Sequence, residues 1–190
     1  MAEIERCFGD GDPLMESYHD EEWGVPVHDS RLLFEKLILD GFQAGLSWRT
    51  VLHKRDHFRR AFDGFDPEQI ARYGEVDRVR LLADPGIIRN KLKVAAAISN
   101  AQAYLDLAER GQNFADFLWS FTGHEVIKRA PERWEDVPAA SPESTAMSKA
   151  LQARGFKFVG PTICYAFMQA VGLVNDHVVS CFRYNELATE

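Results

Sequence analysis

Hydrophobic residues recur at helical spacing along most of this chain, and no useful length alternates between apolar and polar residues. The clearest segment follows Asp29 and Ser30, which are residue types that cap the start of a helix. Apolar residues between Leu33 and Ile38 lie three and four positions apart, and Gly41 would interrupt or end this helix. The pattern therefore predicts an all-α fold.

The same spacing, together with Asp-Pro and Gly boundary signals, divides the rest of the chain into further helices. Pro131, Pro138 and Pro142 break the pattern, so residues 123–142 are predicted to cross the surface as a loop. We expect one all-α domain over residues 1–190, and a division into two helical lobes stays open. The expected helices cover residues 47–62, a short stretch from 67, and residues 75–82, 89–109, 113–121, 142–154 and 161–170.

Composition narrows the class of protein. The chain has 190 residues, of which 46% are hydrophobic, so it can bury one sizeable core. It has an odd number of cysteines, no secretory signal after Met1 and no apolar run that approaches the roughly 18 residues of a membrane span. These features favour a location in the reducing cytoplasm, without disulfides or membrane contact. A monomer is the default expectation. The net charge of −7 argues against a general polyanion binder, so a nucleic acid would have to meet a local basic face.

Four soft metal ligands are split between the two ends of the chain: Cys7 and His19, then His177 and Cys181. Zinc takes about four nitrogen and sulfur ligands in a closed structural site, and a His and a Cys four apart on one helix face would present two of them together. A metal bound by all four would join the N- and C-terminal segments. The spacing is not that of a zinc finger, so buried thiols with surface or capping histidines are an equally good interpretation.

A second signal is the segment Gly155 to Gly160 between two predicted helices. Glycines at both turns of a short hairpin let the backbone approach a ligand, and the amides of the following helix point at an anion. Such a helix-hairpin-helix element grips a DNA phosphate through backbone N–H groups, and Lys157 would add positive charge. Taken alone, the two glycines fit a plain helix cap and turn better.

Three long runs carry a resemblance to a known family. Residues 18–26 (YHDEEWGVP), residues 42–48 (FQAGLSW) and residues 155–169 (GFKFVGPTICYAFMQ), with Asn-Asp-His ending at His177, closely resemble DNA-3-methyladenine glycosylase I. The resemblance implies an all-α helix-hairpin-helix glycosylase fold with one structural zinc ion per chain, bound by Cys7, His19, His177 and Cys181. The implied partner is alkylated double-stranded DNA. The implied reaction hydrolyses the N-glycosidic bond of 3-methyladenine, which leaves as the free base.

The resemblance also implies a pocket for a flipped base. Tyr18 and Trp48 become its stacking walls, and Trp23 is either a further wall or a structural plug. Commonly studied members carry glutamate where this chain has Asp40, and this carboxylate would hydrogen-bond the base. Asp40 is one methylene shorter, so either a water bridges the gap, the backbone moves, or the preferred base differs. A solvated helix end is the alternative for Asp40. Phe8 would close the pocket where some relatives have a tryptophan shortly after the first cysteine.

Expected DNA contacts lie in two loops. Gly45 and Leu46 form the candidate wedge that fills the space left by the flipped nucleotide, and a plain helix connection with Leu46 in the core is the alternative. The hairpin contributes Gly155, Lys157, Gly160 and Thr162. A basic cluster of Arg89, Lys91 and Lys93 is a further candidate for the phosphate-facing surface, and a solvated helix start is the alternative for it.

The mechanism that the resemblance implies needs no carboxylate at Asn175, where many helix-hairpin-helix glycosylases have aspartate. The alkylated base is already cationic and leaves as a neutral molecule, so we expect attack by water and no Schiff base. Asp176 is expected at the surface or behind a metal ligand. The alternative function is a non-catalytic binder of alkylated or distorted DNA on the same fold. A zinc enzyme is less favoured, because four protein ligands leave no open position for water.

Overall fold

The computed structural model describes residues 5–187, which are mostly helical. Two strands, β1 (Ile127–Lys128) and β2 (Val174–Asn175), and three 3-10 turns, at 63–65, 120–122 and 134–136, complete the structure of this range. The helices are α1 (Pro13–Glu21), α2 (Ser30–Gln43), α3 (Trp48–Leu52), α4 (Arg55–Ala61), α5 (Pro67–Ile70), α6 (Glu75–Ala83), α7 (Lys91–Glu109), α8 (Phe114–Trp119), α9 (Pro142–Ala153), α10 (Pro161–Ala170) and α11 (Phe182–Leu187).

Most helices begin at the capping residues that the sequence offers. The Asp29 carboxylate accepts hydrogen bonds from the first-turn amides of α2, and the Asn90 side-chain oxygen does the same for α7. Asp66 caps α5 in the same way, with Pro67 at its first position. These side chains satisfy amides that have no partner inside the helix. The predicted helices over residues 75–82, 89–109, 142–154 and 161–170 are confirmed to within about two residues.

One helix was missed, and two local predictions were wrong. Asp12 and Pro13 cap and start α1, a signal of the same type as Asp66-Pro67 that the hydrophobic pattern did not exploit. The helix predicted over residues 47–62 is divided into α3 and α4. Tertiary contacts hold the side chains at the break, since His53 Nε2 lies 2.9 Å from Asp12 Oδ2 and Lys54 Nζ donates to the Pro85 carbonyl at 3.1 Å.

Gly41 neither interrupts nor ends α2, which continues to Gln43. A Cβ atom at Gly41 would lie 3.4 Å from the Cβ atom of Phe158 in the segment between α9 and α10. The glycine therefore serves close packing between α2 and that segment, and it is not a helix stop.

The all-α prediction holds apart from one short strand pair. Residues 123–142 do form a surface connection, but β1 within it pairs in parallel with β2, in the register Ile127 to Val174. Ile127 N donates to the Leu173 carbonyl at 3.0 Å, and Arg129 N donates to the Asn175 carbonyl at 3.3 Å. The connection is thereby tied to the segment that precedes His177.

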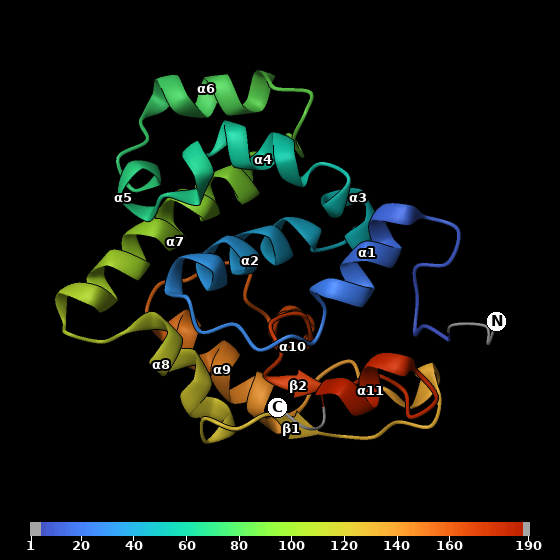
Figure 1. The fold of residues 1–190 in the computed structure, drawn as a ribbon. Coiled ribbons are helices and arrows are strands. Elements are labelled where there is room, and N and C mark those ends of the chain that lie inside the picture. The colour runs from blue at the N-terminus through green and yellow to red at the C-terminus, as the bar shows by residue number, and fades with distance from the viewer. Residues whose placement is uncertain (1–4, 188–190) are drawn as a thin grey trace.

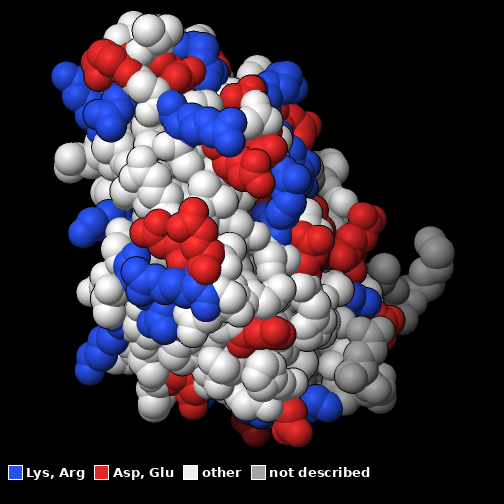
Figure 2. Space-filling model, turned by 90° about the vertical axis from the view of Figure 1, so that its left-hand side faces the viewer, with Lys and Arg blue, Asp and Glu red and all other residues white. Residues whose placement is uncertain are grey.

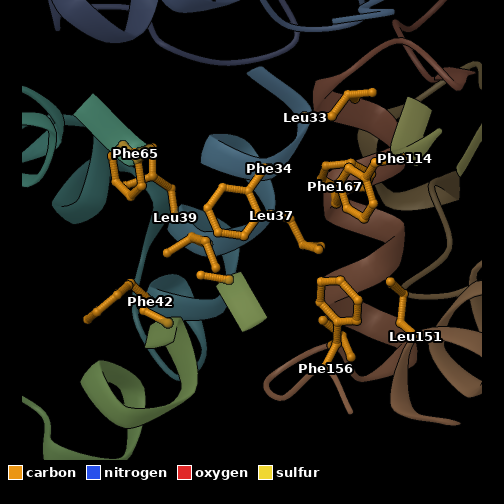
Figure 3. Packing of buried hydrophobic residues seen from close by; sticks show 14 of the residues in the cluster. Leu33, Phe34, Leu37, Leu39, Phe42, Phe65, Phe114, Leu151, Phe156 and Phe167 are labelled. Atoms are coloured by element: carbon orange, nitrogen blue, oxygen red, sulfur yellow. The ribbon is translucent and has the colours of Figure 1, made fainter. Parts of the chain in front are cut away.

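Helix α2 lies across the middle of the molecule, with α4, α5 and α6 on one side and α8, α9 and α10 on the other (Figure 1). Helix α7 packs on α5 and α6 and also on α2, while α10 packs on α2 and α9. Figure 3 shows Phe34 and Leu37 projecting from α2 between Phe65 on one side and Phe167 of α10 on the other. One buried hydrophobic cluster extends from Leu33 to Val174. The single-domain assignment and its division into lobes stay predictions.

Basic and acidic side chains are mixed on the surface of the protein. Figure 2 shows Lys and Arg side chains interspersed with Asp and Glu over the face that it presents, with no wide field of one sign. Among residues 5–187, no helix combines the length and the apolar character that crossing a membrane requires.

Candidate functional site

A cavity of about 240 Å³ lies where α1, the C-terminal half of α2, α3 and α10 meet. Its lining is aromatic and apolar, with a few polar groups, as is typical of small-molecule sites. It includes all five residues expected in the base pocket. The lining residues are Phe8, Met15, Tyr18, Trp23, Lys36, Asp40, Gln43, Trp48, Trp134, Ala166, Gln169 and Ala170.

Aromatic rings form the walls of this cavity. The Tyr18 and Trp48 ring centroids are 5.2 Å apart with planes inclined by 42°, and Tyr18 is buried. Phe8 lies edge-on to Trp23 at 5.1 Å, and Trp134 approaches Phe8 at 5.9 Å. Flat apolar rings around a cavity of this size can stack on a planar base.

Asp40 supplies the carboxylate of the cavity. Its side chain is 1% exposed, so the alternative of a solvated helix end is wrong. Oδ1 accepts a hydrogen bond from Lys36 Nζ one turn earlier on α2, and Oδ2 has no hydrogen-bond partner among residues 5–187. Burial raises the pKa of the Asp40 carboxyl, and the Lys36 ammonium opposes that rise. A buried acceptor without a partner is costly to a fold and marks a position where a ligand can donate.

Lys36 enters the same cavity, which the sequence did not predict. Its Nζ atom lies 3.8 Å from the centre of the Trp48 ring, a cation–π contact. Burial lowers the pKa of the Lys36 ammonium, while Asp40 raises it. The indole Nε1 of Trp48 is also buried without a hydrogen-bond partner in the described part of the chain. The polar end of the cavity thus offers an unused acceptor and an unused donor.

The four expected metal ligands converge beside this cavity. The ligand atoms of Cys7, His19, His177 and Cys181 all lie within 4.8 Å of one another. Cys181 Sγ is 3.3 Å from His177 Nδ1 and 3.5 Å from His19 Nε2. A tetrahedral zinc ion with bonds of about 2.3 Å to sulfur and about 2.0 Å to nitrogen would separate such atoms by about 3.5 Å. The cluster therefore fits a four-coordinate metal.

Neighbouring residues hold the two histidine rings in orientations that suit metal binding. The ring nitrogen of each histidine that faces away from the cluster is engaged, because His19 Nδ1 lies 2.8 Å from Asp20 Oδ1 and His177 Nε2 donates to the Trp23 carbonyl at 3.0 Å. Such contacts fix the orientation of metal-binding imidazoles. A hydrogen bond from Cys7 lowers the pKa of the Cys181 thiol and raises the pKa of Cys7, which places the first thiolate at Cys181.

One geometric expectation for the cluster was wrong. His177 and Cys181 do not share a helix face, because both precede α11. A turn brings them together, in which Cys181 N donates to the Val178 carbonyl at 2.8 Å and His177 N donates to Asn175 Oδ1 at 3.2 Å. A spacing of four residues suits such a turn as well as it suits a helix.

Trp23 connects the cluster to the cavity. Its ring lines the cavity and lies 4.5 Å from the His177 ring, while its carbonyl oxygen accepts the hydrogen bond from His177 Nε2. Trp23 is therefore both a wall and a structural plug, the two roles between which the sequence left a choice.

The expected wedge loop follows α2 directly. Gly45 has a φ of +76°, which favours glycine, and Leu46 is 44% exposed, so the alternative of Leu46 in the core is wrong. Gln43 and Trp48, on either side of this loop, both line the cavity. Buried Lys93 supports the loop from α7, since its Nζ donates to the Phe42 carbonyl at 2.8 Å and to the Ala44 carbonyl at 2.6 Å. Lys93 therefore does not belong to a phosphate-facing surface.

The predicted hairpin joins α9 to α10. Gly155 has a φ of +92°, and Gly160 is the N-cap of α10. Lys157 and Thr162 are exposed. The Asn100 side chain of α7 binds both backbone polar groups of Lys157 in the hairpin. Lys157 N donates to Asn100 Oδ1 at 2.7 Å, and Asn100 Nδ2 donates to the Lys157 carbonyl at 3.0 Å.

The two polar residues before His177 are buried. Asn175 bridges backbone groups, since its Nδ2 donates to the Tyr184 carbonyl at 3.3 Å and its Oδ1 accepts from His177 N. Asp176 Oδ2 accepts from the Tyr165 hydroxyl at 2.6 Å and from Gln169 Nε2 at 2.9 Å. The surface position considered for Asp176 is wrong. Asp176 lies behind Gln169, which itself lines the cavity.

Sequence reasoning missed several lining residues, chiefly Lys36, Trp134 and Gln169. Lys36 was detectable, because a lysine four residues before a carboxylate on one helix lies next to it. Trp134 lies in the connection between Gly123 and Pro142, and its path over the cavity depends on tertiary structure. Gln169 lies on α10 within a run that was assigned to the hairpin element as a whole.

Comparisons with known proteins agree with this arrangement. A family model described as methyladenine glycosylase matches residues 8–184. DNA-3-methyladenine glycosylase 1 of Escherichia coli (strain K12) is 52% identical over 182 residues, which are 95% of this chain and 97% of that protein.

Two solved structures superpose closely. A crystal structure of 3-methyladenine DNA glycosylase I has a TM-score of 0.92 at 52% identity, covering 94% of this chain and 98% of the other. A structure on the basis of 3-methyladenine recognition by 3-methyladenine DNA glycosylase I from Staphylococcus aureus has a TM-score of 0.90 at 36% identity, covering 94% and 95%. With its family-model match, its half-identical relative and its shared fold, this chain belongs to the methyladenine glycosylase family.

Proposed function

We propose that this chain is a monofunctional DNA glycosylase that hydrolyses the N-glycosidic bond of 3-methyladenine in alkylated double-stranded DNA. The observation that supports this best is a cavity lined by the Tyr18 and Trp48 rings and by Asp40, whose buried Oδ2 atom has no hydrogen-bond partner among residues 5–187. The relative from E. coli is named for this base, and the structure from S. aureus is described as showing its recognition. Both support the assignment.

The cavity suits an adenine-type base. Adenine carries an exocyclic amino group that donates hydrogen bonds, and Asp40 Oδ2 is an acceptor. A base in a duplex is out of reach of such a cavity, so the nucleotide must flip out of the stack. Asp40 has a shorter side chain than the glutamate of commonly studied members, and Lys36 on the preceding turn holds its other oxygen.

The reaction needs little further chemistry from the protein. The alkylated base is a cation before the bond breaks and a neutral molecule afterwards, so no general acid has to protonate it. The cavity then contributes stacking, orientation and electrostatic selection, and water attacks the sugar. Asn175 hydrogen-bonds to backbone groups, and Asp176 Oδ2 accepts from Tyr165 and Gln169, while Asp176 Oδ1 is buried without a partner in the described part of the chain.

The ion that suits the cluster of Cys7, His19, His177 and Cys181 is one zinc per chain, since two thiolates and two imidazoles are its usual ligands. Bound there, zinc would supply structural cross-linking of the terminal segments and no chemistry at the base, because four protein ligands close its coordination. The protein is proposed to act as a monomer in the cytoplasm.

DNA contact is assigned to the two loops beside the cavity. Leu46, at the end of α2, would fill the gap in the duplex, and Gly45 lets the backbone approach it. The hairpin would bind phosphates through Gly155, Gly160 and the amide of Thr162, with Lys157 adding charge.

The test is release of free base from methylated duplex DNA, resolved by chromatography, for the native chain and for Asp40→Glu. We expect the native chain to release 3-methyladenine with little 7-methylguanine, and no covalent adduct to form on borohydride treatment. Binding of methylated duplex without any release would instead establish the non-catalytic binder. Release by Asp40→Glu alone would show that the shorter carboxylate has shifted the activity away from this base.

A further inference from the structure

The cavity contains a charged pair, Asp40 and Lys36, and the role inferred for this pair rests on the proposed function. Asp40 and Lys36 face each other one turn apart on α2, with side chains that are 1% and 14% exposed. Few charged groups are buried unless they are paired. The contact uses Oδ1 of Asp40 and leaves Oδ2 without a hydrogen-bond partner among the residues that the structure describes.

Without this lysine the carboxylate would have little reason to stay ionised. The Asp40 side chain is 1% exposed, and burial in a medium of low polarity favours the neutral acid. The charged groups that face the pair from other elements do not replace Lys36. Tyr18 of α1 and Cys164 of α10 are neutral in their ordinary states, and the Arg55 guanidinium is engaged by Glu22 at 2.5 Å.

The protonation state of Asp40 decides which base edge it can read. An ionised carboxylate only accepts, so it pairs with the exocyclic amino group of adenine and repels the O6 atom of guanine. A protonated carboxyl carries one O–H donor, which can pair with O6. A buried carboxyl that changes between these states would therefore discriminate poorly between the two purines.

We propose that Lys36 is a specificity-determining residue that holds Asp40 as a carboxylate with Oδ2 free for the base, and thereby makes the cavity select adenine-type over guanine-type bases. The Trp48 ring holds the Lys36 ammonium in place from the other side, at 3.8 Å. Lys36 is a positioning residue, because it acts through its contact with Asp40.

The expected pH dependence follows from the sign of each effect. Binding of an adenine-type base requires ionised Asp40, so it is present above the Asp40 pKa and is lost as the pH falls through that pKa. Burial raises this pKa and Lys36 lowers it. Removal of Lys36 should therefore move the loss of binding to a higher pH, by about one unit or more, the usual effect of a close opposite charge.

The experiment compares the native chain with Lys36→Met, which keeps length without charge, and Lys36→Arg, which keeps charge. Lys149→Met, at an exposed site on α9, is the matched control. The Asp40 carboxyl is titrated by carbon-13 NMR, and free 3-methyladenine and 7-methylguanine are titrated by calorimetry at several pH values. Each protein meets the same two bases, so the ionisation of the bases contributes equally to every profile.

We expect the Asp40 pKa to rise in Lys36→Met. At pH values below the Asp40 pKa of both proteins, the ionised fraction should fall about tenfold for each unit of that rise, and the preference for 3-methyladenine over 7-methylguanine should fall with it. Lys36→Arg and Lys149→Met should keep the native pKa and preference. An unchanged Asp40 pKa or an unchanged preference in a folded Lys36→Met protein overturns the inference. If the native chain binds neither base, the proposed function fails first, and the NMR titration still decides whether Lys36 keeps Asp40 ionised.

Discussion

At the scale of single residues, Asp40 is the test of base recognition. Asp40→Asn keeps the shape of the side chain but removes its charge and places an amide donor beside Lys36. Because hydrogen bonds to charged groups are worth about 1.5–3 kcal/mol, we expect the affinity for free 3-methyladenine to fall by about tenfold to a hundredfold in calorimetric titration. Asp56→Asn, at an exposed site on α4, is the control and should bind as the native chain does. An unchanged affinity in Asp40→Asn would remove Asp40 from the pocket.

The sequence predicted the pocket residues that lie in family motifs. It did not predict the pocket residues that only the tertiary structure brings to the cavity. The resemblance placed Tyr18, Trp48 and Asp40 in one pocket, and the structure brings them together around one cavity. It gave no role to Trp134, because residues 123–142 follow no helical pattern and are fixed by the pairing of β1 with β2. Lys93 was assigned to the surface on its charge alone, although its ammonium is buried on the carbonyl oxygens at the end of α2.

At the scale of elements, α7 braces both candidate DNA loops. Lys93 binds the carbonyl oxygens before the wedge loop, and Asn100, two turns later, holds Lys157 of the hairpin. The periodicity of the sequence predicted this helix, but periodicity does not show that its polar residues Lys93 and Asn100 are buried. Lys93 and Asn100 have these roles because the C-terminal end of α2 and the hairpin both lie against α7.

Asn100→Ala should separate DNA binding from base binding. The change removes two hydrogen bonds and leaves the Lys157 backbone groups without their partner, at a cost of about 2 kcal/mol in the free energy of unfolding. We expect the affinity for a duplex with an abasic-site analogue, measured by fluorescence anisotropy, to fall severalfold, and the affinity for free 3-methyladenine to stay native. Gln102→Ala on the same helix is the control, since Gln102 Nε2 donates to the Ala71 carbonyl and not to the hairpin. Equal DNA affinity of the two variants would remove the hairpin from the interface.

At the scale of the whole molecule, the metal cluster joins segments 170 positions apart in the chain, Cys7 and His177. A cross-link over so long a loop restricts the unfolded chain by about 5 kcal/mol in the entropic model. With roughly 2–4 °C per kcal/mol for a chain of this size, chelation of the metal should lower the Tm by about 10–20 °C in calorimetry.

Cysteine variants provide the controls for this prediction. Cys181→Ser should lose the single zinc ion, as measured by mass spectrometry, and melt like the chelated native chain. Cys164→Ser changes a buried thiol outside the cluster and should keep the metal. A native chain that binds no metal, or that melts at the same temperature after chelation, contradicts the structural role.

The contact between Trp23 and His177 has a consequence for biosynthesis. Trp23 forms a wall of the cavity, and its carbonyl oxygen accepts a hydrogen bond from His177, which lies 154 positions later in the chain. A nascent polypeptide that still lacks residues 177–181 would have its aromatic residues but no fixed arrangement of them. Recognition of a damaged base would therefore begin only after this last segment has emerged from the ribosome and docked on the first.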